Sequence, residues 1–315
     1  MSEVTIPKEV YSEDYVNVIS LSGGKDSTAL LLRAIELGVD YMAVFADTGH
    51  EHEKTYEYVN YLKERLGIEI KHIQADLSQR VLDKKNTVET KWRKDGVDEA
   101  IIQSALDNLE PTGIPMLDLA LWKGGFPSRR RQFCTHELKV IPMIEQVYEP
   151  IWKSGREVVV WQGIRRAESK ARENAKEFEL LPEGYYAYRP LVEWSARDVF
   201  DMHDKHDVKP NPLYKLGMGR VGCMPCVNTG KDEMYQIYKR FPEVIDRVEE
   251  WERIVSKVAK TGKATFFTTD EVQGDGIRER AEWSVTTRGG RQIDLLKLAE
   301  MESKPTCESI YGLCE

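Results

Sequence analysis

An apolar run, a glycine turn and a helical pattern follow one another without a break near the start of this chain. Residues 15–21 are typical of a buried strand, residues 22–27 read Ser-Gly-Gly-Lys-Asp-Ser, and residues 27–37 have helical periodicity. Glycines let the backbone approach a ligand closely, and the free N–H groups at a helix start attract an anion. This junction therefore predicts a strand–turn–helix unit that binds phosphate.

The side chains of this turn favour a nucleotide that carries a cation. Its donors for phosphate oxygens, and the glycines that leave room for them, are Ser22, Gly23, Gly24, Lys25 and Ser27. Asp26 would repel phosphate unless a cation lay between them, so its presence indicates Mg²⁺ bound with the nucleotide. The alternative interpretation is an ordinary strand-to-helix turn that uses glycine only for close packing.

Strands and helices alternate along the first half of the chain. Residues 41–46 and 68–74 read as strands, and residues 53–66 read as a helix. Such alternation implies a parallel sheet, in which ligands bind beyond the carboxyl ends of the strands. We therefore predict an α/β fold with a parallel sheet, in which the phosphate turn and Asp47 face one crevice.

The rest of the chain is expected to be less regular. Residues 77–126 mix helical patterning with many charges, which indicates an insertion or lid within a nucleotide-binding domain of residues 14–215. A C-terminal region of residues 216–315 is predicted to hold one long helix at 231–259. From Gly262 onward we expect a loosely structured tail that contains cysteines.

Composition limits the class of protein. The chain has 315 residues, of which 41% are hydrophobic and 31% are charged. We expect a soluble, cytoplasmic protein, because there is no apolar run of roughly 18 residues and no secretory signal. The net charge of −8 argues against general coating of nucleic acid. The basic run Arg129–Arg131 could still hold phosphates of a nucleotide or nucleic acid, or be a solvated loop.

A second segment suited to anions follows the strand predicted at residues 158–161. Gly163 precedes Arg165 and Arg166, which the pattern places at a helix start, and Arg172 follows about two turns later. Guanidinium groups suit phosphate or sulfate oxygens because they can donate two hydrogen bonds at once. The alternative is a solvated helix face on which these arginines pair with nearby glutamates.

The cysteines form a third constellation. Cys223 and Cys226 make a C-x-x-C, Cys134 lies in Phe-Cys-Thr-His-Glu-Leu-Lys, and Cys307 and Cys314 lie in the tail. An odd number of cysteines with one C-x-x-C indicates metal or redox chemistry rather than a disulfide framework. Thiolates suit zinc and iron alike, and plain surface thiols remain a third interpretation.

In this order, the motifs resemble those of the phosphoadenosine phosphosulfate (PAPS) reductase family of the PP-loop, adenine nucleotide α-hydrolase-like superfamily. The resemblance covers about residues 14–230 and rests on SGGKDS, DTGH, FCTHELK, WQGIRRAES, NPLY and GCMPC. It implies a doubly wound, mostly parallel α/β fold and an adenine nucleotide whose phosphates lie on SGGKDS. It also implies that Asp47 contacts ribose hydroxyls, Mg²⁺ or a lysine, and that Gly163, Arg165 and Arg166 belong to the nucleotide site.

The resemblance also implies an iron–sulfur cluster. In the adenylylsulfate (APS) reductases of the family, a Cys-Cys pair before a helix ending at a position that here is Pro142 joins a C-x-x-C around one [4Fe–4S] cluster. The corresponding ligands here are Cys134, Cys223 and Cys226. Phe133 replaces one cysteine of the pair, so we assign the fourth ligand to the tail. Cys307 is preferred, because fraying at a chain end suits Cys314 better to a mobile nucleophile.

Three functions follow from the resemblance. The first is an ATP pyrophosphatase, similar to the DndC-type enzymes, that cleaves ATP to AMP and pyrophosphate to activate an acceptor for sulfur transfer. The complete SGGKDS favours it, with Lys25, Asp26, Arg165 and Arg166 as catalytic residues. The alternative is a PAPS or APS reductase in which Cys314 attacks the sulfate sulfur and sulfite is released. The third is a non-catalytic nucleotide-binding subunit.

These functions imply partners. We expect a sulfur donor such as a cysteine desulfurase, or a thioredoxin-like reductant. A nucleic-acid acceptor and a homo-oligomeric assembly are further expectations, and no membrane association is predicted.

Overall fold

The structure is a computed structural model that describes residues 6–267 and 273–286. Within them, one six-stranded sheet runs in the order β3–β2–β1–β4–β6–β5, and all neighbouring strands are parallel except β5 and β6. The strands are β1 (Tyr15–Leu21), β2 (Tyr41–Asp47), β3 (Ile70–Gln74), β4 (Glu157–Trp161), β5 (Phe178–Leu180) and β6 (Tyr186–Tyr188). The order extends to both sides of β1, which confirms the predicted doubly wound, mostly parallel α/β fold.

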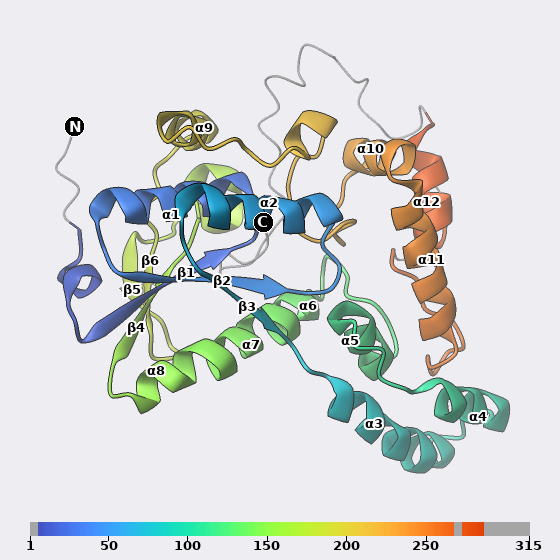
Figure 1. Ribbon diagram of the computed structural model, residues 1–315. Coiled ribbons are helices and arrows are strands. Elements are labelled where there is room, and N and C mark those ends of the chain that lie inside the picture. The colour runs from blue at the N-terminus through green and yellow to red at the C-terminus, as the bar shows by residue number, and fades with distance from the viewer. Residues whose placement is uncertain (1–5, 268–272, 287–315) are drawn as a thin grey trace.

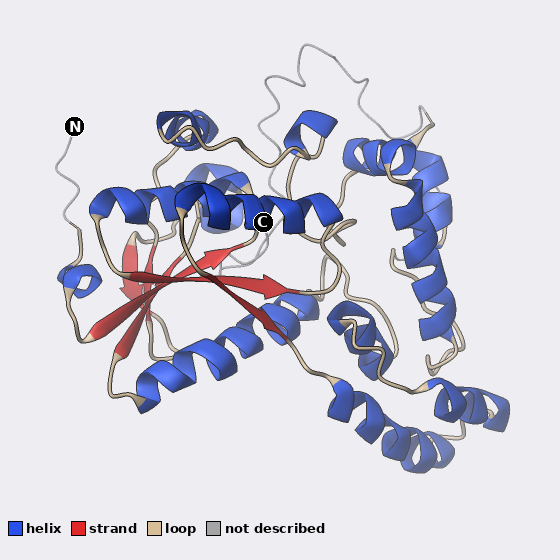
Figure 2. Cartoon of the chain, viewed as in Figure 1, coloured by secondary structure: helices blue, strands red, loops and turns tan. Residues whose placement is uncertain are grey.

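Helices cover both faces of the sheet (Figures 1 and 2). One face carries α1 (Lys25–Leu37), α2 (Glu53–Leu66) and α9 (Ala196–Lys205), and the other carries the helix of residues 133–153. Val18 and Ile19 are adjacent in β1 but belong to different cores: Ile19 packs with Leu31 of α1, and Val18 packs with Val147. This division follows from the alternation of side chains along a strand, and it buries β1 on both faces.

The helix of residues 133–153 is longer than the sequence indicated. Its α-helical parts are α6 (Phe133–Thr135), α7 (Ile141–Met143) and α8 (Glu149–Lys153), with π-helical turns at 136–140 and 144–148. Cys134 lies in its first turn, and the prediction that the helix ends at Pro142 is wrong. Proline lacks an N–H donor, but here it lies between two π-helical turns, where the hydrogen-bond spacing is already altered.

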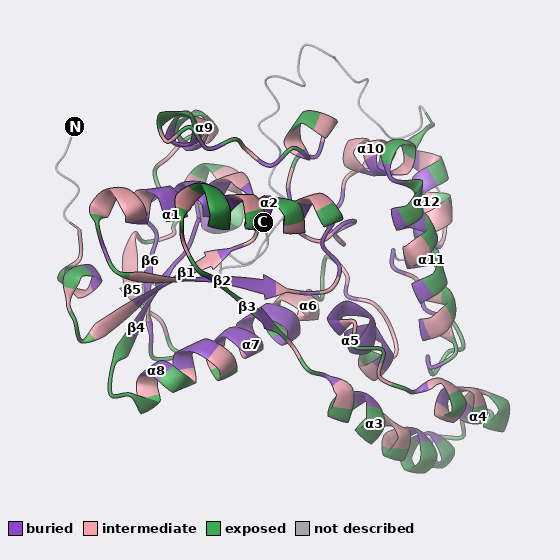
Figure 3. Cartoon of the chain, viewed as in Figure 1, coloured by how far each residue is buried: buried purple, intermediate pink, exposed green. Residues whose placement is uncertain are grey.

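Two further groups of helices pack outside the two cores that flank the sheet. The predicted insertion at 77–126 contains α3 (Ser78–Thr87), a π-helical turn at Val88–Trp92, α4 (Glu99–Asn108) and α5 (Pro115–Lys123). The C-terminal group consists of α10 (Lys231–Arg240), α11 (Pro242–Ser256) and α12 (Gly276–Ser284). Leu121 of α5 and Trp251 of α11 share one core, so the two groups pack together. Figure 1 shows them beyond the carboxyl ends of β2 and β3, and Figure 3 shows α5 buried along most of its length.

The C-terminal region corrects two predictions. The single helix expected at 231–259 is divided, because Phe241 is not helical and Pro242 begins α11, a position where its missing N–H costs nothing. The tail expected to be loosely structured from Gly262 contains α12, whose Ile277 and Ala281 are buried in the core of the C-terminal group. No helix among the described residues is long and apolar enough to cross a membrane.

Candidate functional site

The glycine turn after β1 holds the start of α1 open toward the carboxyl edge of the sheet. Gly24 is the N-cap of α1, and Gly23 has a positive φ of 76°. A Cβ atom on Gly23 would lie 2.8 Å from Cγ2 of Thr55, so both the backbone conformation and the space require glycine here. The hydroxyls of Ser22 and Ser27 lie 3.1 Å apart and close the turn. The predicted strand–turn–helix unit is therefore present.

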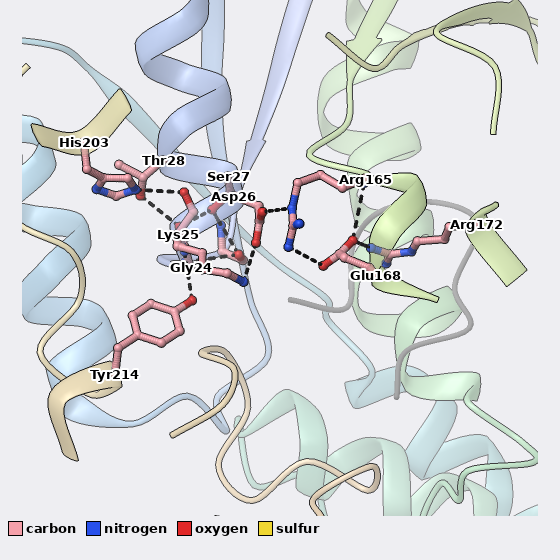
Figure 4. Close-up of polar contacts among 11 residues, drawn as sticks. Gly24, Lys25, Asp26, Ser27, Thr28, Arg165, Glu168, Arg172, His203 and Tyr214 are labelled. Carbon is pink, nitrogen blue, oxygen red and sulfur yellow. Dashed lines mark hydrogen bonds and ion pairs between the residues drawn. The ribbon is translucent and has the colours of Figure 1, made fainter. Parts of the chain in front are cut away.

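Asp26 is the central buried charge of the site (Figure 4). Its side chain is 0% exposed, and its two oxygens lie 2.5 Å from Nε of Arg165 and 2.6 Å from Nζ of Lys25. From the sequence, this carboxylate is expected to have Mg²⁺ beside it. Two side-chain cations already neutralise it in the structure, so the charge of Asp26 alone does not require a metal ion.

A chain of alternating charges continues from Asp26 (Figure 4). Nη2 of Arg165 lies 3.7 Å from Glu168, and the same glutamate pairs with Nη1 of Arg172. Arg172 is 3% exposed, and its Nε and Nη2 have no hydrogen-bond partner among the described residues. Buried guanidinium nitrogens without a partner are costly, so this residue favours an anionic ligand.

The backbone of this segment differs from the expectation. A helix beginning at Arg165 and Arg166 was predicted, but the structure has two single 3-10 turns, at 166–168 and 170–172. Gly163 brings this segment close to α1, because a Cβ atom there would lie 3.3 Å from the backbone of Asp26.

The two adjacent arginines point to different places. Arg165 is buried against Asp26, whereas Arg166 is half-exposed, donates to the carbonyl of Ala175 and pairs with Glu193. Arg165 therefore lies against residues 22–27, which are called the phosphate loop below because the sequence predicts that they bind phosphate. Arg166 lies against a neighbouring loop instead.

The segment after α9 closes over the phosphate loop. Tyr214 accepts a hydrogen bond from the backbone N–H of Lys25 at 2.9 Å, and Asn211 donates to the carbonyl of Gly23 at 3.1 Å. His203 donates from Nε2 to the carbonyl of Lys25 at 2.9 Å, and burial lowers the pKa of its imidazole. The NPLY motif therefore lies directly on the loop, and the hydroxyl of Tyr214 occupies one N–H of the helix start.

Asp47, at the end of β2, is held by groups of the chain itself. Its carboxylate accepts hydrogen bonds from the N–H of Gly49 at 2.8 Å, the hydroxyl of Tyr56 at 2.7 Å and the amide of Gln74 at 2.6 Å. In the structure, these hydrogen bonds fix the turn that follows β2.

The DTGH turn, residues 47–50, contacts the GCMPC segment, residues 222–226, which is called the cysteine loop below. Nε2 of His50 lies 2.9 Å from the carbonyl of Pro225, and the carbonyl of His50 accepts from the N–H of Met224 at 2.9 Å. Thr48 Oγ1 lies 3.4 Å from Cys223 Sγ. Two distant motifs, DTGH and GCMPC, are thus one structural unit.

Two charged residues of this unit were not singled out from the sequence. Glu51 is buried, its Oε1 lies 3.7 Å from Sγ of Cys223, and burial raises the pKa of its carboxyl. Arg247 of α11 donates to the carbonyl of Met224 at 3.0 Å. The residue after DTGH could have signalled Glu51, but no local pattern connects Arg247 to residues 23 positions earlier.

The three cysteines within the described residues approach one another. The charge of Cys226 contributes to raised pKa values at both Cys134 and Cys223, for which burial is the main cause. The pKa of Cys134 rises to about 11. Nη1 of Arg220 lies 3.3 Å from Sγ of Cys226. Burial therefore keeps Cys134 and Cys223 as neutral thiols, unless a cation stabilises the thiolates.

The structure describes three of the four predicted metal ligands, Cys134, Cys223 and Cys226. Cys307 and Cys314 lie outside the described residues. Among residues 6–267 and 273–286, no group of three or more His, Cys, Asp or Glu side chains is arranged to hold a metal ion.

Comparison with known proteins identifies relatives over most of the chain. The family model described as the phosphoadenosine phosphosulfate reductase domain matches residues 16–229. A 37.8 kDa protein of the gpa 5′ region of Escherichia phage 186 is 40% identical, covering 98% of this chain and 100% of that protein. The phosphoadenosine 5′-phosphosulfate reductase of a Synechococcus species is 23% identical, covering 65% of this chain and 72% of that protein.

A solved structure adds a weaker likeness. The PAPS reductase of Candida auris, in a phosphate complex, has 18% sequence identity and a TM-score of 0.41, covering 70% of this chain and 84% of that one. That score is too low to support an inference about this chain.

Proposed function

This chain belongs to the PAPS reductase domain family, and from that premise we propose that it cleaves ATP to AMP and pyrophosphate to activate an acceptor for sulfur transfer. The observation that carries the proposal is the complete SGGKDS loop, with Asp26 buried between Lys25 and Arg165 at the start of α1. This arrangement presents a helix N-terminus and two cations where the phosphates of a nucleotide would lie.

In the proposed reaction, an acceptor oxygen attacks the α-phosphorus of ATP. The bond from that phosphorus to the β-phosphate oxygen breaks, pyrophosphate leaves, and AMP remains on the acceptor. A sulfur nucleophile, delivered by a donor such as a cysteine desulfurase, then displaces AMP. Asp26 positions Lys25 and Arg165, which stabilise the negative charge that develops on the phosphates.

Arg172 extends this anion site. Its two unpartnered nitrogens would be satisfied by phosphate oxygens, and Glu168 holds the guanidinium in place. Mg²⁺ would neutralise phosphate charge when bound with the nucleotide. The described carboxylates of Asp26 and Asp47 are both engaged by groups of the chain, so in this proposal the phosphates carry the ion.

We further propose that Cys134, Cys223 and Cys226 hold a [4Fe–4S] cluster with Cys307 as the fourth ligand. Support comes from the fold, in which the charge of Cys226 acts on the thiol of Cys134 although the two residues are far apart in the sequence. Burial makes these thiols poor nucleophiles without a cation, which favours a ligand role. The cluster would carry or position sulfur.

A PAPS or APS reductase is the second candidate. The 23% identity to the Synechococcus enzyme favours it. In that reaction a cysteine thiolate attacks the sulfate sulfur, the bond from that sulfur to the phosphate oxygen breaks, and the adenosine phosphate leaves. A thioredoxin-like dithiol then attacks the cysteine sulfur, releases sulfite and becomes a disulfide. Burial raises the pKa of Cys134 and Cys223, which makes both thiols poor nucleophiles, and in this proposal the nucleophile is Cys314 near the chain end.

Product analysis separates these candidates. Anaerobically purified protein is incubated with ATP, PAPS or APS, and pyrophosphate and sulfite are measured. We expect pyrophosphate from ATP·Mg²⁺ together with the acceptor, and ATP·Mg²⁺ to raise Tm more than PAPS does. Sulfite release with stabilisation by PAPS alone would establish the reductase instead. Iron and sulfide quantitation on the same sample tests the cluster, and a colourless protein with one zinc per chain would exclude it.

A further inference from the structure

A cavity of about 480 Å³ has a lining that includes no residue of the phosphate loop. Arg129 and Arg130, in the turn before α6, line one part of it, and Arg280 of α12 lines another. Phe266 and Phe267, in the segment after α11, complete its apolar wall. Of the described residues that line it, three are arginines and none carries a carboxylate.

The positive charge around this cavity is unusual for the chain. The protein has a net charge of −8, and its exposed basic side chains are commonly paired with acids. Arg278, two residues from Arg280, pairs with both Asp246 and Glu249. By contrast, Arg129 and Arg130 form no ion pair with any residue that the structure describes. A cavity with several guanidinium groups, and with no carboxylate among the lining residues that the structure describes, attracts an anion.

Contacts around the cavity hold these arginines in place. Arg129 donates from Nη2 to the carbonyls of Asn228 and Thr229 at 3.2 and 3.3 Å. Backbone hydrogen bonds in both directions between Ser128 and Arg131 close the turn that carries it. The guanidinium of Arg280 lies 5.3 Å from the ring centre of Phe267. The donors are therefore partly organised before any ligand binds.

We propose that this cavity binds the phosphate group of a nucleotide, either free or within a single strand, at a site separate from the phosphate loop. Guanidinium groups match phosphate oxygens through paired hydrogen bonds, and the phenylalanines offer an apolar wall for a planar base. The volume is in the range of small-ligand sites. Val227 lines the cavity and directly follows Cys226, so the ligand lies beside the cysteine loop. The assignment does not depend on the proposed reaction.

The experiment measures binding to the full chain carrying Lys25→Ala, which weakens the phosphate loop. The probes are a fluorescein-labelled oligothymidylate strand, followed by anisotropy, and thymidine monophosphate, followed by calorimetry. We expect Arg130→Ala to weaken binding about tenfold, as for loss of one charge-assisted hydrogen bond. Arg197→Ala, at an exposed arginine of α9, is the matched control and should change affinity less than about twofold.

The two probes distinguish the source of the phosphate. Tighter binding of the strand, with a steep loss of affinity as salt increases, identifies a polynucleotide. Equal affinity for the monophosphate identifies a free nucleotide. Arg130→Lys should restore part of the loss, because it keeps the charge without the planar fork. The proposal is overturned if neither probe binds below about 1 mM, or if Arg130→Ala and Arg197→Ala bind alike.

Discussion

Replacing Asp26 by asparagine tests whether this carboxylate organises the site by charge. Asparagine keeps the size of the side chain and one oxygen acceptor but removes the negative charge between Lys25 and Arg165. The side chain of Arg165 is 6% exposed, so it would remain a buried cation without the carboxylate that lies 2.5 Å from its Nε. Breaking a buried pair from one side costs about 3–5 kcal/mol.

The structure places the expected cost at the lower end of that range. Glu168 lies 3.7 Å from Nη2 of Arg165 and would retain part of the compensation. Lys25, whose side chain is 12% exposed, can turn toward solvent. We therefore expect Asp26→Asn to lose about 3 kcal/mol of unfolding free energy and to lower Tm by roughly 6–12 °C.

Urea unfolding and calorimetry measure this loss, with Asp207→Asn as the matched control. Asp207 pairs with Arg65 at an exposed position, where removing the charge should cost less than about 1 kcal/mol. The double variant Asp26→Asn/Arg165→Gln should recover part of the loss, because the buried cation at position 165 is removed together with its carboxylate. Equal stability of Asp26→Asn and Asp207→Asn would refute the reasoning. Pyrophosphate release is then assayed at a temperature where Asp26→Asn is folded, and we expect it to be lost.

Three further changes test other contacts. Arg172→Ala should weaken nucleotide binding by about 1–3 kcal/mol in calorimetry, whereas Arg166→Ala should change it less; equal effects would contradict the assignment. Tyr214→Phe frees the N–H of Lys25, so tighter ATP binding is expected, and unchanged affinity would show that the hydroxyl does not compete. Burial raises the pKa of Glu252 to about 7, above its ordinary value of 4.5, so its stabilising contribution is present below about pH 4.5 and is lost as pH rises through 7. Glu252→Gln should flatten that part of the stability–pH curve, measured by urea unfolding.

The elements with strong periodicity could be predicted from the sequence. The boundaries of β1 and α2 agree with the structure, because an apolar run and two glycine stops define them locally. The start of α9 was also predictable, since Ser195 is its N-cap and Asp198 completes a capping box. By contrast, β5 and β6 are three residues each and carry no such pattern.

Errors arose where a local signal competes with tertiary structure. Pro142 is a strong stop signal, yet the π-helical turns beside it let the helix continue beneath the sheet. The arginine-rich segment has helical spacing, but its residues pair inward with Asp26 and Glu168 and form only short turns. Hydrogen bonding to distant groups decided the conformation in that segment.

The site itself was predictable where a motif is contiguous. The phosphate loop needed only residues 22–27 to be recognised. The role of Arg247 was not predictable, because it reaches the cysteine loop from α11. The sequence likewise indicated two separate motifs at DTGH and GCMPC, whereas hydrogen bonds between His50 and residues 224–225 join them.

The contacts of Asn211 and Tyr214 connect the phosphate loop to the segment that leads to the cysteine loop. These residues form hydrogen bonds with the backbone of Gly23 and Lys25, and Cys223 follows Tyr214 by nine positions. Under the proposed function, a phosphate that accepted the N–H of Lys25 would displace the hydroxyl of Tyr214 and would shift the stretch that leads to the thiols. If the two sites are coupled in this way, thermodynamic reciprocity requires that a ligand on the thiols change nucleotide affinity by the factor by which the nucleotide changes affinity for that ligand. Such coupling between the phosphate loop and the cysteine loop would need no further structural element between them.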